Sequence, residues 1–255
     1  MVKPVIIHIP HASTDIPDHE REKLPIHDGE LRRELLRMTD RYADELSDLG
    51  AQATRLIYPV SRLVVDPERF ADDDKEPMSG KGMGAIYTST SHGRLLRADV
   101  SDGERQRLLQ TYYFPHHAEF TRLVQNALDD CGRCLIIDAH SFPSSPLPCD
   151  LNQDADRPDI CIGTDSFHTP RPLEQMAVGA FEGIGWRVKV NEPYAGTIVP
   201  ERFLGVDSRV GSIMVEVNRA LYMDENTGDK LPQFQTTARN VQAALGALTT
   251  SSAGA

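Results

Sequence analysis

The segment Leu135-Ile-Ile-Asp-Ala-His-Ser141 decides the fold class of this chain. Its apolar run has the length and composition of a short buried strand, and ionisable residues follow that run at once. Val5-Ile-Ile-His-Ile9 repeats the pattern near the start of the chain, just before Pro10 and a polar turn. Short apolar strands that alternate with helices are typical of parallel βαβ units.

The rest of the chain continues this alternation. We expect further strands at 54–57, 63–66, 160–163, 186–190 and 212–217, and helices at 28–49, 101–131, 172–183 and 233–248. Pro115 is expected to bend the second of these helices, and the acidic, Gly-rich segment 71–84 suggests an exposed loop or lid. The pattern predicts one α/β domain over residues 1–248, a three-layer α/β/α sandwich, and a disordered tail at 249–255.

Composition excludes several classes of protein. The chain has 255 residues and a formal net charge of −11, which lacks the basic surface expected of a nucleic-acid binder. No apolar run approaches the ~18 residues of a membrane span. The first residues, MVKPVIIHIPHAS, enter a strand pattern without a signal-peptide pattern. We therefore expect a cytoplasmic protein with no nucleic-acid or membrane partner; its oligomeric state cannot be read from the sequence.

Ionisable side chains gather where the expected strands end. His11 follows the first strand, Asp138 ends a strand expected at 135–138, His140 follows it in an expected polar turn, and Glu216 lies near the end of the strand at 212–217. Ligands of α/β folds bind beyond the carboxyl ends of the strands, and charges beside buried segments are usually paired or bound to metal. Two histidines and one carboxylate form a catalytic zinc site with an open fourth position, and a further carboxylate can act as general base.

Two choices within this set stay open at this stage. Asp40, expected on the first long helix, and Asp44 are four residues apart on one helix face, so either could supply the carboxylate ligand. His8 and His11 form an HxxH pair, but residues three apart in a strand point to opposite faces. His11 is therefore favoured as the ligand, and His8 is expected to pack or to hydrogen-bond behind it.

Three arginines lie close to these strand ends. Arg62 and Arg69 flank Asp66, and Arg219 follows the strand at 212–217. The planar guanidinium grips a carboxylate through two hydrogen bonds, so these residues suit a small anionic substrate despite the acidic chain. The alternative is a structural ion pair with a neighbour such as Asp66 or Glu68.

Seven sequence blocks, in order along the chain, resemble the N-formylglutamate amidohydrolase family. They are Ile9-Pro-His-Ala-Ser13, Thr39-Asp-Arg-Tyr42, Arg62-Leu-Val-Val-Asp-Pro-Glu-Arg-Phe70, Tyr113-Phe-Pro-His-His117, Asp138-Ala-His-Ser141, Asn191-Glu-Pro-Tyr-Ala-Gly196 and Glu216-Val-Asn-Arg-Ala-Leu-Tyr222. The resemblance implies a mostly parallel mixed sheet in a zinc-carboxypeptidase-like (phosphorylase/hydrolase-like) fold. It also implies metal-dependent hydrolysis of the amide of N-formylglutamate, a step of histidine degradation, or of a similar N-acyl amino acid.

The resemblance also assigns roles to single residues. It implies a divalent metal, with zinc expected and iron or manganese left open, on His11, Asp40 and His140. Glu216 corresponds to the general base. The substrate side comprises Arg62, Arg69, Arg219, His117 and Asn191, while Asp138 and His8 are expected to hydrogen-bond behind the ligands.

Two other functions remain as alternatives. The first is a deacylase or amidase for a different small N-acyl amino acid or peptide-like amide, because position 8 is His where the family pattern has a small residue. The second is a non-catalytic sensor of small anions that uses the same arginines beside a degenerate metal site. Metal content and a substrate panel distinguish the alternatives.

Overall fold

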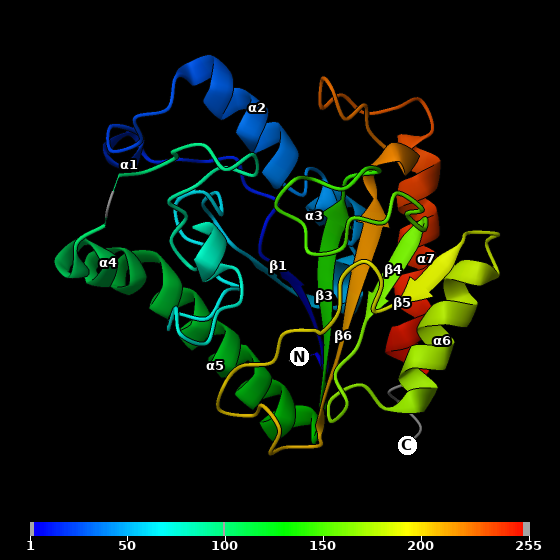
Figure 1. Ribbon diagram of the computed structural model, residues 1–255. Coiled ribbons are helices and arrows are strands. Elements are labelled where there is room, and N and C mark those ends of the chain that lie inside the picture. The colour runs from blue at the N-terminus through cyan, green and yellow to red at the C-terminus, as the bar shows by residue number, and fades with distance from the viewer. Residues whose placement is uncertain (1–2, 99, 252–255) are drawn as a thin grey trace.

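One six-stranded sheet organises the computed structural model, which describes residues 3–98 and 100–251. The strand order is β2-β1-β3-β6-β4-β5, and Figure 1 labels every strand of this order from β1 to β5. The strands are β1 (Val5–Ile9), β2 (Thr54–Ile57), β3 (Cys134–Phe142), β4 (Ile160–Gly163), β5 (Val188–Val190) and β6 (Val210–Asn218). β4 runs antiparallel to β6 and the other neighbouring strands are parallel, which confirms the mostly parallel mixed sheet.

Helices cover both faces of the sheet, so the three-layer α/β/α sandwich is confirmed (Figure 1). They are α1 (Asp18–Arg21), α2 (Asp28–Met38), α3 (Ala43–Leu46), α4 (Asp102–Leu108), α5 (Phe114–Cys131), α6 (Arg171–Glu182) and α7 (Phe234–Ser251). Apolar side chains of α3, α6 and α7 share one core with the sheet, and those of α5 share another. Within the described ranges, no helix has the length and hydropathy to cross a membrane.

The alternation of side chains along the strands determines the face on which the polar residues lie. Ile6 of β1 belongs to the core beneath α5, and His8, two residues on, shares its face. Asp138 and His140 of β3 and Glu216 of β6 lie on this face too, because each is an even number of residues from a strand residue in that core. The strand register places His8 beside Asp138 and His140 beside Glu216.

The expected helix at 28–49 is wrong in its length. α2 ends at Met38, Thr39 is extended (φ −91°, ψ 132°), and Tyr42 has a left-handed backbone (φ 66°) before the short α3. The Asp40 N–H leaves the helical pattern and donates to the His11 carbonyl at 2.9 Å. Both α2 and α3 pack their apolar sides inward, and for this reason the apolar spacing suggests one continuous helix. The hydrogen bond from Asp40 to His11 instead holds the intervening residues at the end of β1.

Two predicted strands need correction. Residues 63–66 form turns instead of a strand, although Leu63, Val64 and Val65 are fully buried, so the apolar pattern reflected burial alone. The strand expected at 186–190 begins only at Val188.

The helical region expected at 101–131 is confirmed as α4 and α5, joined by a π-helical turn at Leu109–Tyr113 ahead of Pro115.

Segment 71–84 folds into turns, and Met78 and Met83 within it are buried. At the other end, α7 continues through Ser251, and residues 252–255 of the expected tail lie outside the described residues.

Candidate active site

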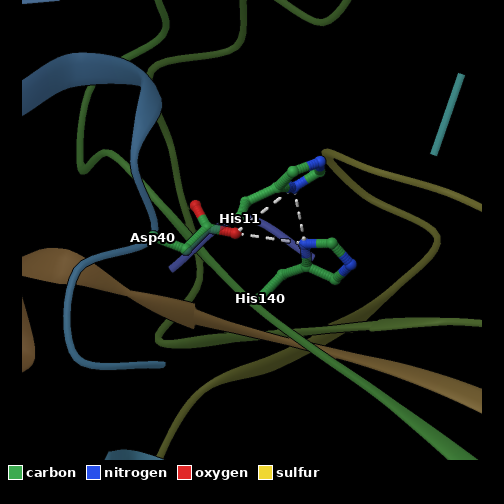
Figure 2. Close-up of side chains that lie close together, drawn as sticks. All are labelled: His11, Asp40 and His140. Atoms are coloured by element: carbon green, nitrogen blue, oxygen red, sulfur yellow. Dashed lines mark hydrogen bonds and ion pairs between the residues drawn. The ribbon is translucent and has the colours of Figure 1, made fainter. Parts of the chain in front are cut away.

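Three donor atoms from distant parts of the sequence converge at the C-terminal edge of β1 and β3 (Figure 2). His11 follows β1, Asp40 lies in the break between α2 and α3, and His140 is near the end of β3. Nδ1 of His140 is 3.3 Å from Nδ1 of His11 and 3.1 Å from Oδ2 of Asp40, and the remaining side of this triangle is 3.7 Å. Two ligands of a tetrahedral zinc ion lie about 3.3 Å apart, so the donor positions fit one ion.

The far ring nitrogens of both histidines face carboxylates. Nε2 of His11 is 2.8 Å from Oδ1 of Asp66, while Nε2 of His140 is 3.0 Å from Oε2 of Glu68 and 3.1 Å from Oδ1 of Asp138. A ring proton held at Nε2 leaves the Nδ1 lone pair free. Two such lone pairs and a carboxylate oxygen repel one another unless a cation lies between them, and two imidazoles with one carboxylate suit zinc or a similar divalent ion.

An arginine holds the third donor in place. The Arg219 guanidinium donates to Oδ1 of Asp40 at 2.8 Å and to the carbonyl of Arg37, so the other carboxylate oxygen of Asp40 remains directed at the histidines. Burial opposes ionisation of Asp40, but its contacts with His11 and His140 and the charge of Arg219 outweigh burial and hold its pKa well below the ordinary range. Asp40 is therefore an anionic donor.

Glu216 lies next to the three donors without sharing their hydrogen bonds. It is the register partner of His140 on the adjacent strand, is buried, and its Oε2 has no hydrogen-bond partner among the described residues. Burial raises the pKa of Glu216 to about 8, helped by repulsion from Asp40 and opposed by His140 and Arg219. A carboxyl group with a raised pKa and a free oxygen is suited to exchange a proton near neutral pH.

A cleft of about 1100 Å³ opens onto these groups. It takes in the three donor residues and Glu216, together with side chains from three surrounding segments, 67–83, 113–121 and 194–204. The cleft therefore leads a small molecule up to the three donor residues and to Glu216.

The three arginines expected to bind substrate differ in their surroundings. Arg62 is 13% exposed and forms a close ion pair with the buried Oδ2 of Asp66 at 2.7 Å, and the guanidinium of Arg219 is buried in its pair with Asp40. All three line the cleft, but Arg69 has the most exposed side chain, 28% accessible, although its Nε, which has no hydrogen-bond partner among the described residues, is itself buried. The carboxylates nearest to it, Asp66 and Glu76, are 3.7 and 3.6 Å away. Arg69 is thus the most available of the three to an anionic ligand.

The other two residues expected on the substrate side lie in different places. His117 lines the cleft, and its Nε2 is 2.8 Å from the carbonyl of Pro67. Asn191 is exposed and does not line the cleft, since its side chain hydrogen-bonds to Thr164. The structure therefore brings His117, but not Asn191, to the cleft.

Both residues expected behind the ligands are fully buried. Oδ1 of Asp138 is close to Nε2 of His140 and 2.9 Å from Nδ1 of His8. On the far side of the His8 imidazole, Nε2 is 2.9 Å from Nε2 of His116, and this imidazole stacks on Phe120 of α5. His8 thus reaches His140 through Asp138.

Sequence reasoning missed the contacts of Asp66 and Glu68 with the ring nitrogens, having considered them only as partners of arginines. The Asp-x-Glu spacing in a buried turn was a possible signal, but their contacts with histidines depend on the fold. The structure also separates the two candidate carboxylates: Asp40 belongs to the donor group, and Asp44 does not.

Comparison with known proteins gives one consistent result. The sequence model of the family described as N-formylglutamate amidohydrolase matches residues 3–223. An N-formylglutamate deformylase of Pseudomonas putida is 26% identical over 227 residues, which cover 87% of this chain and 82% of that protein.

Two solved structures share the fold. An N-formylglutamate amidohydrolase from Ralstonia eutropha has a TM-score of 0.83 and 22% identity, over 99% of this chain and 95% of its own. A gene product of Agrobacterium tumefaciens has a TM-score of 0.70 and 19% identity, over 97% and 91% of the two chains.

Proposed function

The chain belongs to the N-formylglutamate amidohydrolase family, and on this premise we propose that it hydrolyses the amide bond of N-formylglutamate or a closely similar N-acyl amino acid. One observation carries the proposal: two imidazole nitrogens and a carboxylate oxygen converge beside Glu216, whose carboxyl oxygen is free and whose pKa is raised to about 8. This arrangement has the groups that amide hydrolysis needs at one point of the cleft.

His11, Asp40 and His140 would hold a divalent cation, with zinc the expected ion. When bound, such an ion would activate water and polarise the acyl carbonyl. Asp66 would accept the Nε2 proton of His11, and Asp138 and Glu68 would do the same for His140, which keeps both Nδ1 atoms directed at the ion.

Glu216 is the general base of this proposal. In its ionised form it accepts a proton from the attacking water as the new C–O bond forms, and it then gives that proton to the leaving nitrogen as the C–N bond breaks. Its position beside His140 on the adjacent strand and its unpartnered Oε2 support this role.

Arg69 is the residue that we propose for the substrate carboxylate. Arg62 and Arg219 already form close ion pairs with Asp66 and Asp40, and through them they support the donor group. Arg69 lies in the cleft with 28% of its side chain exposed and no ion pair closer than 3.6 Å among the described residues, so a carboxylate of the substrate can bind its guanidinium and hold the amide in place.

A substrate panel tests the proposal. We expect the zinc-loaded enzyme to release glutamate from N-formyl-L-glutamate, and to act much more slowly on N-formyl-L-glutamine, which differs only in lacking the side-chain charge. Glutamate release is measured by an amino-group assay. An enzyme that carries zinc and leaves every N-acyl glutamate intact would contradict the function.

The size of the cleft favours a second candidate substrate, a larger N-acyl or peptide-like amide of an acidic amino acid. A volume of about 1100 Å³ is at the upper end of pockets for drug-sized ligands, well beyond the needs of a one-carbon acyl group. Including N-acetyl- and γ-glutamyl amides in the same panel distinguishes the two candidates by their relative kcat/KM.

A further inference from the structure

A second group of side chains surrounds the other ring nitrogen of His140. Nε2 of His140 is 3.1 Å from Oδ1 of Asp138, which is 2.9 Å from Nδ1 of His8. Glu68 completes the circuit, because its Oε1 is 3.5 Å from His8 Nδ1 and its Oε2 is 3.0 Å from His140 Nε2. Two imidazole nitrogens and two carboxylate groups thus alternate around a closed circuit of contacts, which we call the His8 ring.

The His8 ring carries two carboxylates that no arginine or lysine neutralises within the described residues. Asp40 pairs with Arg219, and Asp66 pairs with Arg62. Glu68 and Asp138, in contrast, have ion-pair contacts with histidines only. Asp138 is buried and Glu68 has only 17% of its side chain exposed, and carboxylates withdrawn from water without a positive partner are costly, so this position favours a cation.

We propose that the His8 ring binds a second divalent cation of the zinc type, held by His8, Glu68, Asp138 and Nε2 of His140. Its donor separations of 2.9–3.5 Å are close to the spacing of about 3.3 Å between two ligands of tetrahedral zinc. His140 is 95% buried, and its Nε2 has no well-aligned hydrogen-bond partner among the described residues, although it faces both carboxylates. When both ions are bound, the second ion displaces the Nε2 proton of His140, and the resulting imidazolate joins the two ions, one at each nitrogen.

The surroundings of the His8 ring suit a metal ligand set. His116 lies 2.9 Å beyond Nε2 of His8, so it can accept the proton of that nitrogen and orient Nδ1 toward the ion. Glu68 and Asp138 line the cleft, which supplies a path for the ion to enter. All four ligand positions come from the protein, so this is a closed site that supports His140 and does not itself bind substrate.

Metal stoichiometry tests the proposal directly. Untagged protein is stripped with dipicolinate, loaded with excess Zn²⁺, desalted and analysed for zinc by mass spectrometry. We expect two zinc ions per wild-type chain, one in Glu68→Gln and one in Asp40→Asn, which lacks a donor of the first site. Glu201→Gln removes another carboxylate that lines the cleft, and this control should keep two.

One zinc ion per wild-type chain would overturn the second site, and so would two ions in both the wild type and Glu68→Gln. If Glu68→Gln does not fold, wild-type crystals grown with Zn²⁺ decide the question by anomalous scattering. A peak between His8 Nδ1 and His140 Nε2 supports the site, and a single peak at His11 and Asp40 overturns it. Neither measurement needs a substrate. A chain that binds two ions but hydrolyses no amide would therefore refute the proposed function and leave the second metal site supported.

Discussion

His140 connects most of the polar groups in the site, because its two ring nitrogens face different partners. Nδ1 faces His11 and Asp40, and Nε2 faces Asp138 and Glu68. While the imidazole binds a single ion it carries one proton, and the carboxylates behind it determine that this proton lies on Nε2 and that Nδ1 remains free. The chemistry of this residue is thus determined by neighbours from four different segments of the chain.

The protonation of Glu216 should produce the acidic limb of the pH profile. Only the ionised carboxylate accepts a proton, and burial raises its pKa from 4.5 to about 8, so kcat/KM should fall as the pH drops through a midpoint between these values. A bound cation nearby attracts the ionised form and keeps the midpoint below 8.

Steady-state kinetics from pH 4 to pH 9 measure this limb. Glu216→Gln should lose it, with turnover lower by about 10²–10⁴-fold and zinc content unchanged. A wild-type midpoint at or below 4.5, or near-normal turnover in the variant, would contradict the role of Glu216.

Replacing Arg69 should affect substrate binding more than turnover. In Arg69→Met the substrate carboxylate loses a charged hydrogen-bond donor, worth about 1.5–3 kcal/mol, so KM for N-formyl-L-glutamate should rise about 10- to 100-fold. Arg122 lies on the exposed surface of α5 in a pair with Glu119, and Arg122→Met is the matched control. An unchanged KM in Arg69→Met would contradict this role and would mean that another cationic residue of the cleft binds the substrate carboxylate.

At the scale of elements, the break after Met38 shows how a local pattern yields to tertiary contacts. The apolar periodicity predicts a continuous helix, but a helix through Asp40 would keep its N–H bonded within α2. In the structure this N–H donates to the carbonyl of His11, while Arg219 holds the carbonyl of Arg37. These two long-range hydrogen bonds place the carboxylate beside the histidines.

The helix layer formed by α3, α6 and α7 carries no site residue, so we expect its packing to affect stability and not activity. Phe181 of α6 is fully buried and stacks on Trp186, so Phe181→Ala leaves a cavity and should lower the free energy of unfolding by about 3–5 kcal/mol. Urea denaturation measures the change. Phe167, a phenylalanine that is 45% exposed, is the control, and its replacement by alanine should cost less than about 0.5 kcal/mol. A loss below 1 kcal/mol in Phe181→Ala would contradict tight packing of α6.

At the scale of the whole molecule, a bound ion would connect segments that are far apart in the sequence. The donors lie after β1, after α2 and in β3, so an ion that binds them also holds these segments together. Removing zinc should therefore destabilise the folded chain as well as stop hydrolysis.

Thermal unfolding with and without a chelator tests this coupling. An ion present at 1,000 times its Kd stabilises the fold by about 4 kcal/mol, which corresponds to a Tm about 10 °C higher for a chain of this size. Asp40→Asn should show a clearly smaller shift, and added Zn²⁺ should restore the wild-type Tm. Equal Tm values in the presence and absence of chelator would contradict metal binding at these donors.

Much of this fold was predictable because its strands are short and apolar and its long helices are periodic. The sheet type and the layers followed from that alternation, and the residues after the strands included His11, His140 and Glu216. The strand expected at 63–66 failed for a physical reason. Buried turns and buried strands have the same apolar composition, and only hydrogen-bond partners distinguish them.

The sequence by itself determined which residues share a face of each strand, since a period of two requires only the local backbone. The strand expected at 135–138 continues through Phe142 in the structure, and the same period then places Asp138 and His140 on one side of β3. Only the tertiary structure decided that Asp40 and not Asp44 joins them, and that Asp66 and Glu68 back the histidines. These contacts join residues far apart in the chain across strand register and irregular turns, and no local periodicity encodes such distances.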